Sequence, residues 1–146
     1  MRFNGEVIIN RPKELVAKLF VDPKYMGEYQ DGFLRKELES GKPNQKGAVS
    51  KIYYQYGKRE MELTETITSS NLPDTIEAFY HHMHMDNTMR CIFTSIGEHS
   101  TRYEYEFEYT EVRGFIAKMM MRFAPGMFKK PAAKWMNQFK AFVEKQ

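Results

Sequence analysis

The sequence predicts an α+β fold in which a seven-stranded antiparallel sheet packs with a long C-terminal helix. Seven runs typical of strands lie between residues 6 and 112, and most are joined by links of hairpin length, which connect antiparallel neighbours. Helical spacing of apolar residues appears after the first run and again over residues 115–143. A length of 146 residues suits one domain, so we expect a single domain over 1–146.

The apolar residues of the chain are of an unusual kind. Leu, Ile and Val together number 20, whereas Phe, Tyr, Trp and Met together number 32. A low content of branched aliphatic residues can indicate disorder. Rings and thioethers, however, provide the apolar surface that a folded domain buries. We therefore expect a folded interior built mainly from aromatic residues and methionine.

Composition also excludes several classes of protein. No apolar run approaches the roughly 18 residues of a membrane-spanning helix. Cys91 is the only cysteine, which excludes an intramolecular disulfide framework and a cysteine-based zinc finger. The first residues lack the apolar stretch of a signal peptide, so the expectation is a soluble cytoplasmic protein.

The first elements are a short strand over residues 6–10 and two short helices. Pro12 suits the first turn of a helix, where its missing N–H has no partner to lose. The apolar face of this helix consists of Leu15, Val16, Leu19 and Phe20. Asp22-Pro23 predicts a second helix start, because Asp is a good N-cap and Pro is tolerated at the next position. Gly32 should end that second helix.

The other strands are expected over residues 33–40, 48–56, 59–69, 75–85, 88–96 and 101–112. Asp86-Asn87 is expected to form one of the turns between them. The last strand alternates most regularly, and its aromatic positions are Tyr103, Tyr105, Phe107 and Tyr109. Arg and Glu occupy the positions between these rings, so one face should be aromatic and the other charged and solvent-exposed.

The C-terminal segment is expected to be a long helix with a break or kink at Pro125-Gly126. One face of its first half carries Phe115, Ile116, Met119, Met120 and Phe123. The apolar stripe of its second half is Phe128, Ala132, Trp135, Phe139, Phe142 and Val143. Three successive helical residues cannot share a face, and Met121 is expected to point outward among the consecutive methionines 119–121.

Short motifs follow one another in a fixed order along nearly the whole chain. They are Val7-Ile8-Ile9-Asn10-Arg11-Pro12 running into Leu15-Val16, then Asp22-Pro23, Gly41-Lys42-Pro43 before Gly47, Gly97 followed by Thr101-Arg102, and Phe142-Val143-Glu144. This order resembles that of the START-like, or SRPBCC, superfamily, which includes the polyketide cyclase/dehydrase-type proteins and has the helix-grip fold. The resemblance implies a curved sheet wrapped around the C-terminal helix, with a cavity between them for an apolar ligand.

The superfamily includes lipid carriers and receptors as well as cyclases and hydrolases, and its members share no catalytic residue. The resemblance therefore implies a cavity rather than a reaction. We expect non-catalytic binding of a small hydrophobic ligand, lipid-like or aromatic, without a cofactor. Tyrosine hydroxyls would orient its polar end, because a buried hydroxyl needs a partner. The residues expected to line the cavity are Tyr103, Tyr105, Phe107, Tyr109, Met119, Met120, Phe123, Met61, Leu63 and Glu65.

Glu65 is the charged residue in this set. It shares a face with Met61, Leu63 and Ile67 if the strand over 59–69 alternates regularly. A carboxylate that points into a cavity is costly unless it is paired or protonated, so Glu65 would act as a polar anchor for a ligand head group. A bulge, or an outward turn at the strand end, is an equally good interpretation.

His81-His82-Met83-His84 is the motif closest to a chemical site. On a strand, His82 and His84 share one face and His81 lies on the other, and the pattern leaves open which face points inward. Two histidines supply only half of a zinc site; a carboxylate such as Glu65 could complete one, but nothing in the spacing requires it, so no metal is expected. If the protein is a cyclase- or hydrolase-type enzyme, His81 or His82 with a cavity tyrosine is the candidate acid–base pair.

Charge is distributed unevenly along the chain. Residues 113–146 have a balance of +7 and residues 1–112 a balance of −4. The plainer interpretation is that the basic helix balances the acidic outer face of the sheet. A basic amphipathic helix also suits transient contact with an anionic membrane, whereas no nucleic-acid partner is expected. A chaperone-activator-like interaction module is a third interpretation and would need an exposed apolar patch. The sequence leaves the oligomeric state open.

Overall fold

The computed structural model describes residues 1–146 and has the predicted α+β architecture. Its elements are β1 (Arg2–Ile9), α1 (Lys13–Val21), η1 (Pro23–Glu28), β2 (Phe33–Ser40), β3 (Val49–Tyr56), β4 (Arg59–Asn71), β5 (Thr75–His81), β6 (Met85–Gly97), β7 (Ser100–Val112), α2 (Phe115–Phe123) and α3 (Gly126–Glu144). No helix in the chain is both long enough and apolar enough to cross a membrane.

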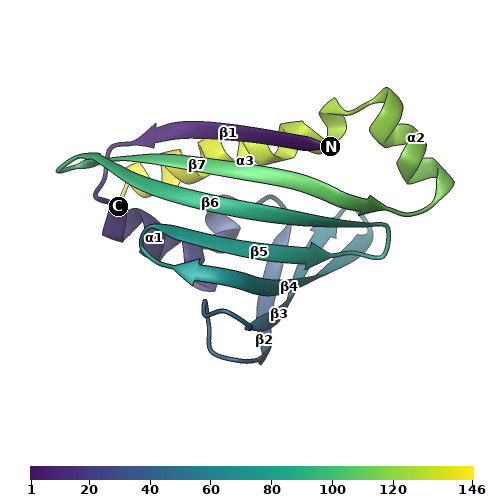
Figure 1. The fold of residues 1–146 in the computed structure, drawn as a ribbon, viewed down its shortest axis with the longest axis horizontal. Helices are drawn as coiled ribbons and strands as arrows, with labels where there is room; N and C mark the ends of the chain where they lie inside the picture. The colour runs from purple at the N-terminus through teal and green to yellow at the C-terminus, as the bar shows by residue number, and fades with distance from the viewer.

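The seven strands form one antiparallel sheet in the order β1-β7-β6-β5-β4-β3-β2. Every neighbouring pair except β1–β7 is consecutive in the chain, as hairpin links require. The first strand is longer than expected, because its backbone pairs with β7 from Arg2↔Glu108 to Ile9↔Thr101. Figure 1 shows the sheet curving around α3, so the concave face of the sheet and this helix enclose the interior.

The second helix start is confirmed. The carboxylate of Asp22 accepts a hydrogen bond from the backbone amide of Lys24 at 3.0 Å, and Pro23 follows as the first residue of η1. Gly32 then turns the chain toward β2 with a φ of +77°, a conformation in which a side chain would be strained.

The turn between β5 and β6 lies earlier than expected. The expected strand over 75–85 ends at His81, and Asp86-Asn87 belongs to β6 instead of forming the turn. The amide of His82 donates to the carbonyl of Met85 at 2.9 Å, which closes the turn over residues 82–84. Residues 82–84 therefore do not alternate across a strand, and the expected pairing of His82 and His84 on one strand face is wrong.

Aromatic rings in edge-to-face contact close one end of the interior. Phe20 of α1 has its ring centroid 5.5 Å from Phe93, 5.5 Å from Tyr103 and 5.4 Å from Phe139. Ring pairs at these separations and at steep angles pack favourably beyond the area they bury. We call Phe20, Phe93, Tyr103 and Phe139 the aromatic cluster; it joins α1, β6, β7 and the second half of α3.

The C-terminal segment is split into two helices, and α2 projects beyond the sheet (Figure 1). Gly114, with a φ of +89°, turns the chain out of β7, and Ala124 leaves the helical conformation before Pro125. No residue of α2 is buried, so the expectation that Met119, Met120 and Phe123 of its apolar face line an interior cavity is wrong. Met121 is half-buried while Met119 and Met120 are exposed, which reverses the expected order.

Candidate ligand-binding cavity

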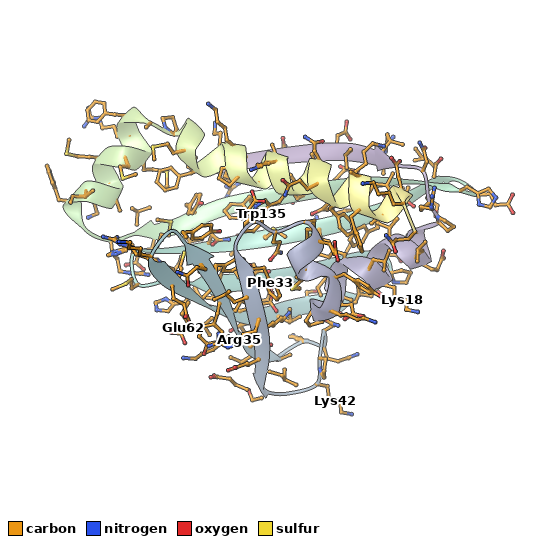
Figure 2. All side chains as sticks on the ribbon, turned by 180° about the vertical axis from the view of Figure 1, so that it is seen from behind. Lys18, Phe33, Arg35, Lys42, Glu62 and Trp135 are labelled. Atoms are coloured by element: carbon orange, nitrogen blue, oxygen red, sulfur yellow. The ribbon has the colours of Figure 1, made fainter.

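A cavity of about 350 Å³ lies between the concave face of the sheet and α3. This volume is within the range of small-molecule sites. Of its 33 lining residues, 26 are hydrophobic. The lining on α3 consists of Met127, Phe128, Pro131, Ala132, Trp135, Met136 and Phe139. Trp135 stacks on Tyr54 of β3 at 5.7 Å between ring centroids, so the helix and the far strands meet across the space (Figure 2).

The structure brings most of the predicted lining residues together. Those that line the cavity are Tyr103, Tyr105, Phe107 and Tyr109 of β7, and Met61, Leu63 and Glu65 of β4. Met119, Met120 and Phe123 do not line it. They are exposed on α2, because the break at Ala124-Pro125 directs that helix away from the sheet.

The cavity wall contains a buried ion pair. Lys36 Nζ lies 2.7 Å from Glu65 Oε1, and the side chains are 10% and 6% exposed. The hydroxyl of Tyr80 donates to Glu65 Oε2 at 2.8 Å. Glu65 therefore points inward, and each of its carboxylate oxygens has a donor, which offsets the cost of removing the charge from water.

Three strands contribute to this group. Glu65 of β4 lies directly opposite Tyr80 of β5, while Lys36 of β2 reaches across β3. Burial raises the pKa of the Tyr80 hydroxyl well above its usual value, and the neighbouring Glu65 carboxylate raises it further. Sequence reasoning found Glu65 but not its partners. The sequence carries no local signal for Lys36, because Leu34 and Leu38, at the alternate positions on either side of it, are themselves exposed.

Some of the other tyrosine hydroxyls in the interior have a hydrogen-bond partner within the protein, and others do not. Tyr29 donates to the carbonyl of Phe20 at 2.9 Å, and Tyr54 donates to the side-chain oxygen of Gln30 at 2.8 Å. The oxygen of Tyr103 lies 3.9 Å from Cys91 Sγ.

Tyr105 and Tyr109 form no hydrogen bond with the protein through their hydroxyls, although both rings line the cavity. No fully buried polar side-chain atom lacks a partner, so these two hydroxyls keep accessible surface. Burial raises the pKa of Tyr109 to about 12, and both hydroxyls are therefore protonated donors at neutral pH.

Of the histidines, only His82 lines the cavity. The backbone amide of His84 donates to His82 Nδ1 at 3.1 Å, so in the neutral ring the proton is on Nε2. Burial and the neighbouring charges of His84, His81 and Arg113 lower the pKa of His82, which keeps the ring neutral. His82 can therefore offer an N–H to a ligand, but its Nδ1 is already engaged.

His81 lies outside the cavity and belongs to an ion cluster at the base of α2. Its Nδ1 is 2.7 Å from Asp86 Oδ1, and Arg113 contacts both oxygens of Asp86 at 2.8 and 3.0 Å. The Arg113 guanidinium, and then His81, lower the pKa of Asp86 to about 2. Arg113 also donates to the carbonyls of His82 and Met83, which ties the end of β7 to the turn over 82–84.

The chain has no cluster of three or more His, Cys, Asp or Glu side chains placed to hold a metal ion.

The mouth of the cavity lies at the end opposite the aromatic cluster. Met127, in the first turn of α3, lines the cavity and is 56% exposed. Tyr56, at the end of β3, also lines the cavity and is exposed. The first turn of α3 and the end of β3 therefore form part of its rim.

Solved structures with the same fold cover nearly the whole chain. A conserved protein from Geobacillus kaustophilus is 17% identical with a TM-score of 0.79, over 99% of this chain and 96% of that one. An aromatase/cyclase from Streptomyces sp. R1128 is 10% identical with a TM-score of 0.79, over 99% and 94% of the two chains. A START superfamily protein from Mycobacterium smegmatis is 12% identical with a TM-score of 0.76, over 99% and 97%.

These likenesses show the fold, and they confirm the START-like helix-grip architecture that the sequence motifs predicted. No family model matches the chain, and no curated protein matches it in sequence.

Proposed function

We propose that this protein binds a small hydrophobic ligand with one polar end in the cavity between the sheet and α3. The observation that carries the proposal is an apolar cavity of about 350 Å³ whose wall contains the buried pair Lys36–Glu65. Apolar walls favour a ligand that loses water on binding. A lipid-like molecule and an aromatic one both meet this requirement, and neither needs a cofactor.

The polar end of the ligand is assigned to the neighbourhood of Lys36. An ammonium group has three N–H donors, and the carboxylate of Glu65 is the one acidic partner of Lys36. A carbonyl, carboxyl or hydroxyl oxygen of the ligand would accept from the remaining donors. The unpartnered hydroxyls of Tyr105 and Tyr109 offer a second position for a polar atom, toward the other side of the sheet.

The fold supports the proposal without identifying the ligand. The likenesses to a START superfamily protein and to an aromatase/cyclase are at 12% and 10% identity, which extends to architecture only. A cytoplasmic location and transient membrane contact through the basic C-terminal segment stay predictions.

Two experiments test binding. Native mass spectrometry of freshly purified protein should detect a co-purifying small molecule. Trp135 is the only tryptophan and lines the cavity, so its fluorescence should change saturably on titration with oleic acid or with 2-naphthol, and the two probes distinguish lipid-like from aromatic preference. A protein without bound ligand and without a saturable response to either probe would contradict the proposal.

Matched variants locate the binding. Ala132→Phe fills the cavity and should weaken probe binding by roughly tenfold or more. Ala141→Phe, on an exposed position of α3 outside the cavity, should leave binding unchanged. The double variant Lys36→Met/Glu65→Gln removes both charges together and should weaken oleic acid more than 2-naphthol, if the carboxyl group lies at Lys36.

A cyclase- or hydrolase-type enzyme is the alternative, and His82 is the histidine it would have to use. Because His82 Nδ1 accepts from the amide of His84, the ring is set as a hydrogen-bond donor instead of a general base. His81 lies outside the cavity, against Asp86. The geometry therefore favours binding over acid–base catalysis by these histidines.

A further inference from the structure

The outer face of α2 is an exposed apolar surface. Phe115, Ile116 and Phe123 are 77%, 73% and 72% exposed, and Met119 and Met120 are exposed beside them. We call these five residues the α2 patch. They are spaced i, i+1, i+4, i+5 and i+8, so they lie on one side of the helix. Single exposed apolar residues are common, whereas five on one side of a nine-residue helix, with two phenylalanines, form an interaction surface.

The opposite side of α2 is the one that faces the protein. Ala117 and Met121 are half-buried there, and the only substantial contact of α2 is with α3. The apolar side is thus directed outward by the packing of the helix, and the α2 patch has no partner within the chain.

Unpaired cations lie beside the α2 patch, on α2 itself and at the start of the next helix. Lys118 and Arg122 lie on α2, and Lys129 and Lys130 lie in the first turns of α3. None of the four forms an ion pair, whereas Arg113, Lys134 and Lys140 in the same segment pair with Asp86, Asp31 and Glu144. There is no acidic residue between Glu111 and Glu144. The charge around the patch is therefore positive and uncompensated.

We infer that α2 docks on the surface of an anionic membrane, with the α2 patch inserted at the boundary of head groups and acyl chains. An amphipathic helix with aromatic residues on one face and Lys and Arg beside it binds membranes in this orientation. The basic residues then meet anionic head groups, and each contributes to binding at low salt. Two copies joined through this patch would instead bring the same unpaired cations together, and the resulting repulsion disfavours a symmetric dimer.

The docking surface adjoins the mouth of the cavity. Met127 lines the cavity, is itself exposed, and follows Phe123 by four residues. Docking through α2 would place this mouth at the membrane, where an apolar ligand could pass without crossing water. That consequence rests on the proposed binding function, whereas docking itself does not.

Co-sedimentation of the full chain with vesicles tests the inference. The vesicles are phosphatidylcholine alone, or phosphatidylcholine with about one-third phosphatidylserine. We expect binding to the anionic vesicles at least tenfold tighter than to the neutral ones, and weaker binding as salt is raised. Measurement of oleic acid binding on the same preparation separates a failure of docking from a failure of the cavity proposal.

Two pairs of variants assign the binding to α2. Phe115→Ser/Phe123→Ser should weaken binding to anionic vesicles at least tenfold, whereas Leu34→Thr/Leu38→Thr, at exposed positions of β2, should not. Lys118→Gln/Arg122→Gln should weaken it roughly tenfold or more. Its control is Lys42→Gln/Lys46→Gln, in the loop between β2 and β3; Figure 2 shows Lys42 below the sheet, far from α2.

Three results would overturn the inference. They are no binding of the unaltered protein to anionic vesicles, equal binding by the Phe115→Ser/Phe123→Ser variant, and a dimer in light scattering that this variant dissociates. The last result would assign the α2 patch to a second copy of the chain.

Discussion

The regions beyond the two ends of the cavity carry similar side chains but are stabilised in different ways. At the closed end, the aromatic cluster packs rings from a helix, two strands and α3 against one another, and Phe139 and Phe93 are almost fully buried. Beside the open end, which α2 does not line, the rings and thioethers of α2 are exposed, and the ion pair of Arg113 and Asp86 holds the base of this helix. Side-chain packing thus holds the elements of the closed end together. The position of α2 depends instead on the Arg113–Asp86 ion pair and on the backbone turns at either end of the helix.

The difference in burial between the aromatic cluster and α2 indicates which residues stabilise the fold and which are available for function. Residues of the closed end should determine the free energy of unfolding, because they lose the most contact with water on folding. Residues of α2 gain little from folding, so their apolar character is better explained by something outside the chain. The buried pair Lys36–Glu65 lies between these extremes, since it is enclosed like the core and charged like the surface.

The largest effect is expected from Phe139→Ala. Phe139 is 1% exposed and contacts Phe20, Tyr29 and Tyr103, so its truncation leaves a cavity in the aromatic cluster. We expect a loss of about 3–5 kcal/mol in the free energy of unfolding, measured by urea denaturation. A loss below about 1 kcal/mol would mean that the closed end is not packed as described.

Glu65→Gln should come next. The substitution keeps an acceptor for Tyr80 but leaves the ammonium of Lys36 without its counter-ion. We expect a loss of about 3 kcal/mol by the same measurement. The double variant Lys36→Met/Glu65→Gln should recover most of it, because no buried charge is then uncompensated. A double variant as unstable as the single one would show that the pair is not the source of the effect.

The ion cluster at the base of α2 should give a smaller, pH-dependent effect. The pKa of Asp86 is about 2 in the folded protein, below its usual value of 3.8. Its stabilisation is therefore fully present above about pH 4 and is lost as the pH falls toward 2. With allowance for solvent screening, we expect Asp86→Asn to cost about 1 kcal/mol at pH 7.

Unfolding of Asp86→Asn and of the unaltered protein at a series of pH values checks this prediction. The difference between the two proteins should shrink between pH 4 and pH 2. A difference that is constant over this range would contradict the assignment of the effect to the charge of Asp86.

The smallest effect on stability is expected from Phe115→Ser/Phe123→Ser. Both side chains are exposed, so the free energy of unfolding should change by less than about 0.5 kcal/mol. Thermal unfolding followed by circular dichroism measures it. A loss of several kcal/mol would show that α2 packs on the domain, which would remove the contrast between the two ends.

Much of the candidate site could be predicted from β7 and β4. The alternation of Tyr103, Tyr105 and Phe107 with charged residues placed these rings on one face, and the sheet geometry then directs that face inward. Glu65 was found in the same way. Its partners were not, because Lys36 and Tyr80 lie 29 and 15 positions from it in the chain and meet it only through the register of four strands.

The turn over residues 82–84 shows a second limit. Asp86-Asn87 has the composition of a turn, but Asp86 pairs with Glu111 in the ladder and its side chain is held by Arg113. A tertiary contact therefore overrode a local preference. Nothing in the sequence near Asp86 indicates a partner 27 residues later.

The sequence by itself determined the order of the elements, the approximate range of each strand and the aromatic inner face of β7, because these depend on local periodicity and turn residues. It also determined that α2 is amphipathic. Only the tertiary structure decided what the apolar side of α2 faces. Periodicity defines a face relative to the helix axis, but the direction of that axis was set by Gly114 and by the break at Ala124-Pro125. Those few backbone angles turned residues expected to line a cavity into an exposed surface.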